Sequence, residues 1–221
     1  MFVTTNKKIG YIHIPKCGGT SVFLAFDKLG REKEDIPWSP WPIAKTHAKY
    51  VNIENKLDLH PEIWFTSIRN PYARFHTWYY FIQEWDKKRL NGELPLKGQT
   101  EESLQYRIDF YSNHSPKEVL KKFDNLLSTK ENKLKHAVSN ISTLQYAWVK
   151  DCPNIKIFKL EKINEMWDWL KNIGCPVDYT HAKKNDNKLG SWQDFDEETL
   201  LLIQKRWADD FEKFGYELVV T

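Results

Sequence analysis

The sequence predicts an α/β fold in three layers, with a mainly parallel central sheet and helices on both of its faces. Short apolar runs typical of buried strands occur at residues 9–14, 63–68 and 155–160. Each run is followed by a segment in which apolar residues recur at helical spacing. Strands that alternate with helices in this way favour parallel strands joined by helical crossovers.

The chain should open with a strand, a glycine turn and a helix. The strand over residues 9–14 stops at a proline and a glycine pair, after which Thr20 or Ser21 can cap a helix ending near residue 29. Residues 31–42 contain three prolines and are expected to form an irregular connection. The other expected elements are a strand at 43–47, a helix at 71–88, helices within 100–113 and 116–127, helices at 164–173 and 196–214, and polar loops at 89–99 and 180–194.

Length and composition predict a single domain over residues 1–221. The net charge of +3, with 33 basic and 30 acidic residues, argues against a nucleic-acid or membrane-surface binder. No segment approaches the ~20 apolar residues of a membrane span. Cys17, Cys152 and Cys175 are odd in number and lack metal-ligand spacing, so we expect a cytoplasmic protein without a metal site or a disulfide framework.

The segment PKCGGTS, which follows the first strand, has the setting of an anion site. Backbone N–H groups and the dipole of the helix that it opens can face a phosphate. Gly18 and Gly19 permit close approach, Thr20 and Ser21 add hydroxyl donors, and Lys16 adds a full positive charge. The nucleoside-triphosphate P-loop places its lysine after the glycines, whereas this segment places it before them. We therefore expect a P-loop-like anion site other than the ATP motif, the alternative being an ordinary turn with a surface lysine.

A second cation follows the strand over residues 63–68. Arg69 begins the segment RNPYARFHTWYYF and can bind an anion through two parallel N–H donors. Thr77 lies eight residues later in the expected helix, where its hydroxyl could face the same anion. Two strand-end cations, Lys16 and Arg69, favour a ligand with two anionic ends. The alternative for Arg69 is a structural pair with a carboxylate, and the aromatic residues of the helix are expected to form a core stripe.

The two segments resemble the nucleotide-binding signatures of the sulfotransferases that use 3′-phosphoadenosine-5′-phosphosulfate (PAPS), and are most similar to the carbohydrate-type, Golgi-like branch. TLQYAWVKD, IKIFKLEKI, HAKKN and LLLIQKRWADDFEKFGYE also fall in the order seen in that branch. By this resemblance the 5′-phosphosulfate would be bound by the loop residues Lys16, Cys17, Gly18, Gly19, Thr20 and Ser21. The 3′-phosphate would be bound by Arg69 and Thr77. Lys184 and Lys188 are further candidates for the nucleotide phosphates, the alternative being a solvated lysine run.

The resemblance implies transfer of a sulfuryl group to an acceptor hydroxyl or amine, with carbohydrate as the first candidate acceptor and no metal. Lys16 is expected to stabilise the leaving phosphate. His47 matches the family's catalytic histidine in position and is the expected general base. His13 is expected to be a packed residue, and His76 is expected to point away from the nucleotide because its neighbour Thr77 faces it. A carboxylate, Glu84 or Asp86, is a weaker alternative base. A nucleotide kinase and a catalytically inactive module that holds nucleotide or polysaccharide remain alternative functions.

Overall fold

The computed structural model describes residues 1–32, 40–42, 49–52, 61–96, 98–128, 134–178 and 190–219. The chain divides into two compact units, each made of two separate stretches of sequence. The sheet unit contains Met1–Asn70 and Gln145–Asp186, and the helical unit contains Pro71–Leu144 and Asn187–Thr221. The single domain expected from the sequence stays a prediction.

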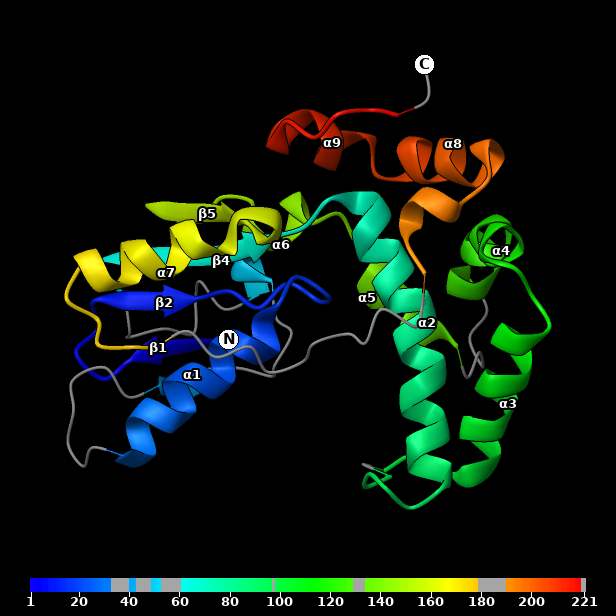
Figure 1. Cartoon of the computed structure of the whole chain (residues 1–221), viewed down its shortest axis with the longest axis horizontal. Helices are drawn as coiled ribbons and strands as arrows, with labels where there is room; N and C mark the ends of the chain where they lie inside the picture. The colour runs from blue at the N-terminus through cyan, green and yellow to red at the C-terminus, as the bar shows by residue number, and fades with distance from the viewer. Residues whose placement is uncertain are drawn as a thin grey trace. The chain divides into compact units, whose positions relative to one another are not determined.

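The sheet unit is built on a mixed sheet whose five described strands follow the order β3-β1-β2-β4-β5. Figure 1 labels β1, β2, β4 and β5 of this sheet. β2 pairs with β4 and β4 with β5 in parallel, whereas β1 is antiparallel to both β2 and β3. Four of these strands therefore run in one direction, and the predicted α/β class with a mainly parallel sheet is confirmed. The strands are β1 Phe2–Thr4, β2 Ile9–Tyr11, β3 Pro40–Pro42, β4 Ile63–Ile68 and β5 Ile155–Lys159.

Helices lie on both faces of this sheet. On one face α1 (Gly19–Glu32) and α7 (Ile163–Asn172) cover a core that includes Tyr11 and Phe65, whose ring centroids lie 4.9 Å apart. Side chains alternate along a strand, so Trp64 points to the opposite face. There Tyr50, from the short helix η1 (Tyr50–Asn52), packs edge-on against it at 5.6 Å. The helix α6 (Tyr146–Val149) lies beside η1.

The sequence prediction misplaces two parts of this sheet. Residues 40–42, expected in an irregular connection, form β3 at the edge of the described sheet, where prolines lose no ladder hydrogen bond. β2 ends at Tyr11 and not at residue 14, although the N–H of Ile12 still donates to the carbonyl of Phe65 at 3.0 Å. The strand expected at residues 43–47 falls outside the described residues.

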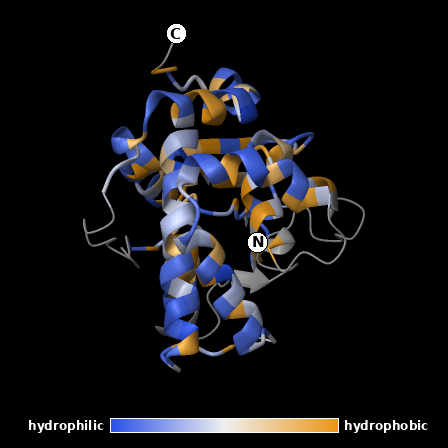
Figure 2. Cartoon of the chain, turned by 90° about the vertical axis from the view of Figure 1, so that its right-hand side faces the viewer, coloured by the Kyte–Doolittle hydropathy of each residue, from blue (hydrophilic) through white to orange (hydrophobic). Residues whose placement is uncertain are grey.

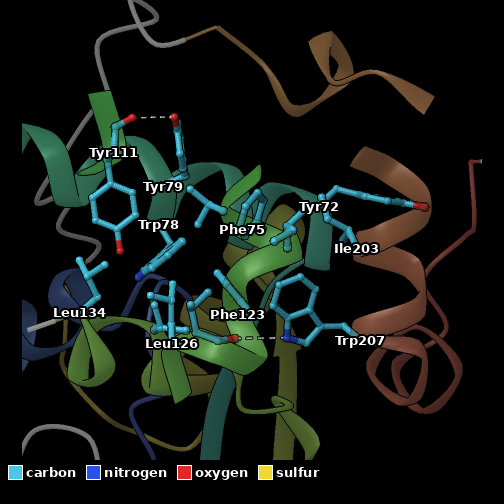
Figure 3. Packing of buried hydrophobic residues seen from close by; sticks show 14 of the residues in the cluster. Tyr72, Phe75, Trp78, Tyr79, Tyr111, Phe123, Leu126, Leu134, Ile203 and Trp207 are labelled. Carbon is cyan, nitrogen blue, oxygen red and sulfur yellow. Dashed lines mark hydrogen bonds between the residues drawn. The ribbon is translucent and has the colours of Figure 1, made fainter. Parts of the chain in front are cut away.

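The helical unit buries an aromatic core between its helices. Phe75 and Trp78 of α2 lie in this core with Phe123 and Trp207, and the Trp78 and Phe123 ring centroids are 5.6 Å apart (Figure 3). Phe75 and Trp78 of the expected aromatic stripe are therefore confirmed as core, whereas Trp85 is half-buried and lies outside this cluster. Figure 2 shows that helices of the chain carry both hydrophilic and hydrophobic residues, as helices do when they bury one side. Its helices are α2 Pro71–Leu90, α3 Glu101–Ser112, α4 Pro116–Ser128, α5 Lys135–Ser142, η5 Trp192–Asp194, α8 Glu197–Arg206 and α9 Ala208–Phe214.

The helix expected over residues 196–214 is two helices, interrupted at Trp207. The indole of Trp207 is 1% exposed and its Nε1–H donates to the carbonyl of Ile141 at 3.2 Å, a tertiary contact that fixes the break (Figure 3). The expected start is confirmed, because Asp196 caps α8 by accepting from the N–H of Thr199 at 2.7 Å. Hydrogen bonds from Thr199 lower the pKa of Asp196 to about 2.

Two further findings concern the cysteines and the described helices. All three cysteines lie in the described part, and each is a free thiol there. Across the same described ranges, no helix combines the length and the apolar composition that crossing a bilayer requires.

Candidate functional site

The glycine loop lies at the edge of the sheet where the parallel strands end (Figure 1). The chain leaves β2, β4 and β5 at this same edge, because these strands run in one direction. The segments that follow them contact one another: the N–H of Asn70 donates to Glu161 Oε1 at 2.8 Å, and Arg69 Nη1 donates to the carbonyl of Lys16 at 3.5 Å. Ligands of open α/β sheets bind outside the carboxyl ends of the strands.

The backbone of the loop presents N–H groups at the start of α1. The N–H of Cys17 donates to Ile14, and the N–H of Ser21 donates to the carbonyl of Gly18 at 3.0 Å. By contrast, the described residues contain no hydrogen-bond acceptor for the N–H groups of Gly18, Gly19 and Thr20. Successive N–H groups at a helix N-terminus, where the dipole is positive, are suited to an anion.

Both glycines of the loop are required by their surroundings. Gly18 has φ +83°, and a Cβ there would lie 2.6 Å from Cδ1 of Leu160. A Cβ on Gly19 would lie 2.0 Å from Cδ2 of His13. The His13 ring is 6% exposed and packs between Tyr11 and Phe23, at centroid distances of 6.1 and 5.6 Å. His13 is thus a packed residue, as expected, and its ring occupies the space that Gly19 leaves open.

We expect Gly19→Ala to lower the free energy of unfolding by about 1–3 kcal/mol, because the new methyl group would overlap a buried ring. Urea denaturation measures this loss. Adding His13→Ala removes the ring, so the double variant should be less destabilised than the sum of the two single variants. Strictly additive losses would show that overlap with the His13 ring is not the reason why Gly19→Ala is destabilising.

Hydroxyl groups at the end of β4 hold the loop in place. Ser67 Oγ donates to the carbonyl of Cys17 at 2.5 Å, and the Tyr11 hydroxyl donates to Ser67 Oγ at 3.3 Å. Burial raises the pKa of Tyr11, which keeps this hydroxyl protonated as a donor. Thr66 Oγ1 donates to the carbonyl of Ile12 at 2.7 Å. Sequence reasoning missed these residues, although two hydroxyl residues in the apolar strand IWFTSI were a visible signal.

Gln145 is a second residue that sequence reasoning missed. Its side chain is fully buried, with Oε1 accepting from the Arg69 N–H and Nε2 donating to the Arg69 carbonyl, both at 2.8 Å. The Cys17 thiol also donates to Oε1, at 3.0 Å. The sequence signal for Gln145 is the segment TLQYAWVKD, which contains it and is one of the segments that occur in the same order in the family that the chain resembles.

The structure gathers part of the predicted site at one edge of the sheet unit. This part is the glycine loop and Arg69, with Lys16 and Ser21 half-buried, Cys17 buried and Thr20 exposed. Thr77 is half-buried on α2, in the helical unit, and its place at the 3′-phosphate stays a prediction. The predicted residues outside the described ranges are His47, Lys184 and Lys188.

His76 and the alternative base Asp86 have structural roles in the helical unit. His76 is 9% exposed and packs against Tyr80 and Phe195, at centroid distances of 4.7 and 5.5 Å. Asp86 is 1% exposed and forms a two-bond ion pair with Arg107, with both hydrogen bonds at 2.8 Å. The carboxylate of Asp86 is therefore committed to an arginine, which argues against the role of general base.

Comparison with known proteins identifies a family for the chain. A family model described as "Sulfotransferase family" matches residues 1–217. The matched region contains the glycine loop, Arg69 and Gln145, and it extends through the sheet unit and the helical unit. No curated protein and no solved structure matches the chain.

Proposed function

The chain belongs to the sulfotransferase family, and we propose that it transfers the sulfuryl group of PAPS to an acceptor hydroxyl or amine. The observation that carries the proposal is the glycine loop. Its N–H groups at Gly18, Gly19 and Thr20 have no acceptor among the described residues, and they open a helix at the ligand-binding edge of the sheet. Lys16 belongs to the same loop and adds a full positive charge.

The residues present fit the two anionic ends of such a nucleotide. The loop would hold the 5′-phosphosulfate, because close backbone approach at Gly18 and Gly19 is combined with the helix dipole. Arg69 would hold the 3′-phosphate, and its guanidinium already reaches the loop at the Lys16 carbonyl. We propose Thr77, Lys184 and Lys188 as further contacts to the nucleotide, on the basis of the resemblance.

Sulfuryl transfer requires two functions of the chain's own residues, which are stabilisation of the leaving phosphate and removal of the acceptor proton. When bound, PAPS supplies the sulfuryl group and the phosphate that leaves. Lys16 and the N–H groups of the loop would stabilise the negative charge that develops on that phosphate, as pre-aimed donors do without reorganisation. His47 would take the proton of the acceptor, because an imidazole titrates near neutral pH.

We propose a carbohydrate as the first acceptor class to test and the cytoplasm as the compartment. The acceptor rests on the likeness to the carbohydrate-type branch. The compartment rests on the free thiols of Cys17, Cys152 and Cys175, which suit a reducing environment. A small-molecule acceptor is the second class to test.

Nucleotide binding tests the proposal directly. Calorimetry should show that the protein binds 3′,5′-adenosine bisphosphate (PAP), the product nucleotide, more tightly than 5′-AMP or magnesium ATP. Incubation with PAPS and cell extract should then yield, by mass spectrometry, products that gain one sulfuryl group. Preference for magnesium ATP with ATP hydrolysis would instead establish the kinase alternative. PAP binding without turnover on a broad acceptor panel would establish the inactive module.

A further inference from the structure

We propose that Gln145 is a positioning residue that fixes the separation between the two cationic ends of the nucleotide site. This inference rests on the proposed function, because it assumes that Lys16 and Arg69 bind opposite ends of one ligand. Gln145 itself would not touch the nucleotide. Its role would be to hold in place, through hydrogen bonds, the backbone segments that carry both cationic side chains.

The first interaction that holds this backbone is the pairing between the Gln145 amide and the Arg69 backbone. The amide accepts from the N–H and donates to the carbonyl of the same residue, at 2.8 Å each. This reproduces the exchange of two hydrogen bonds by which a residue of a neighbouring strand would hold Arg69. β4 ends at Ile68, so the side chain of Gln145 extends the ordered backbone by one residue, to the one that bears the guanidinium.

The second interaction connects Gln145 to the glycine loop. Oε1 of Gln145, which accepts from Arg69, also accepts from the thiol of Cys17 at 3.0 Å. Cys17 is buried and directly follows Lys16. One buried oxygen therefore joins the residue next to the first cation to the backbone of the second cation.

Local sequence cannot supply this link. Gln145 is 76 residues from Arg69 and 128 residues from Cys17, and it is the first residue of the stretch with which the chain returns to the sheet unit. The amide is fully buried, so removing it would leave the N–H and carbonyl of Arg69 without these partners. Groups left unsatisfied in this way favour movement of the segment toward solvent.

Loss of Gln145 should weaken the binding of ligands with two anionic ends more than the binding of ligands with one. The three N–H groups of the loop do not contact Gln145, so a ligand with only a 5′-phosphate depends little on it. A ligand with a second phosphate gains the Arg69 contact only when both cations keep their separation. A charge-assisted contact of this kind corresponds to roughly a tenfold to hundredfold gain in affinity.

The test is the ratio of the dissociation constants for 5′-AMP and PAP, measured by calorimetry on the full chain. Gln145→Leu removes the amide, and Gln145→Glu keeps the shape and an acceptor oxygen but loses the donor to the Arg69 carbonyl. We expect both variants to lower the ratio about tenfold or more through weaker PAP binding, with the affinity for 5′-AMP changed less than about threefold. Val177→Ala is the control, because Val177 is a buried core residue of the same unit and its loss should lower stability without changing the ratio.

Each outcome has one meaning. An unchanged ratio in both Gln145 variants, or an equal loss of both affinities, would overturn the positioning role while leaving the proposed function intact. A wild-type protein that does not prefer PAP would remove the proposed function and the inference with it. Circular dichroism of each variant confirms that the binding data come from folded protein.

Discussion

Lys16→Ala should lower kcat for sulfuryl transfer from PAPS about 10²–10³-fold, the loss typical of removing one pre-aimed donor to a developing anion. Lys16 stands in the glycine loop at the sheet edge, with its carbonyl at 3.5 Å from Arg69 Nη1. Its ammonium would act on the leaving phosphate, where charge grows between the bound state and the transition state. A steady-state assay with PAPS measures the effect, which should fall mainly on kcat.

Lys7 provides a matched control for this substitution. Lys7 and Lys16 both have positive φ, at 57° and 68°, so replacement by alanine has the same backbone consequence at each position. Lys7 is exposed and precedes β2, at the sheet end opposite the glycine loop. Lys7→Ala should therefore leave kcat within about twofold of the wild type. Equal losses in the two variants would assign the effect to general destabilisation and not to the charge of Lys16.

The left-handed backbone at Lys16 allows activity and stability to be separated. A non-glycine residue in this region is disfavoured by roughly 1–2 kcal/mol, part of which glycine offsets by its greater freedom in the unfolded chain. Lys16→Gly should therefore be about 0.5–1 kcal/mol more stable than Lys16→Ala, with kcat equally low. Such a result would show that the loop keeps a strained residue for its charge.

The glycine loop could be predicted because it is local. A strand, two glycines and a helix are contiguous in sequence, and the parallel direction of β2 and β4 then places Arg69 at the same edge. The role of Gln145 could not be predicted in this way. Its partners lie 76 and 128 residues away, and a single glutamine carries no periodicity that marks it as buried.

The errors in the fold prediction have a tertiary origin. The sequence over residues 196–214 is compatible with one continuous helix, and the break depends on a hydrogen bond from Trp207 to Ile141 in another element. β3 contains two prolines, which argue against a strand unless it lies at an edge, and edge position depends on the whole sheet. Neither the hydrogen bond of Trp207 nor the edge position of β3 can be inferred from local sequence propensity.

The ion pair between Asp86 and Arg107 leads to the largest stability effect that we expect. Asp86 is 1% and Arg107 8% exposed, and Arg107 donates both Nε and Nη2 to the carboxylate at 2.8 Å. Arg107→Leu would leave a buried carboxylate whose remaining arginine contact is Arg89 at 3.4 Å. We expect the free energy of unfolding to fall by about 3–5 kcal/mol, as is typical when one partner of a buried pair is removed. Urea denaturation measures the loss.

Two further variants separate burial of charge from the ion pair itself. Asp86→Leu combined with Arg107→Leu removes both charges, and it should recover most of the stability, because apolar pairs often replace buried ion pairs at little expense. Lys88→Ala breaks the half-exposed pair with Glu84 on the same helix, and it should lower stability by about 0.5 kcal/mol or less. A loss in Arg107→Leu no larger than that in Lys88→Ala would refute the argument. Sulfuryl transfer per folded molecule should persist in the double variant, since a carboxylate held by an arginine serves the fold and not proton transfer.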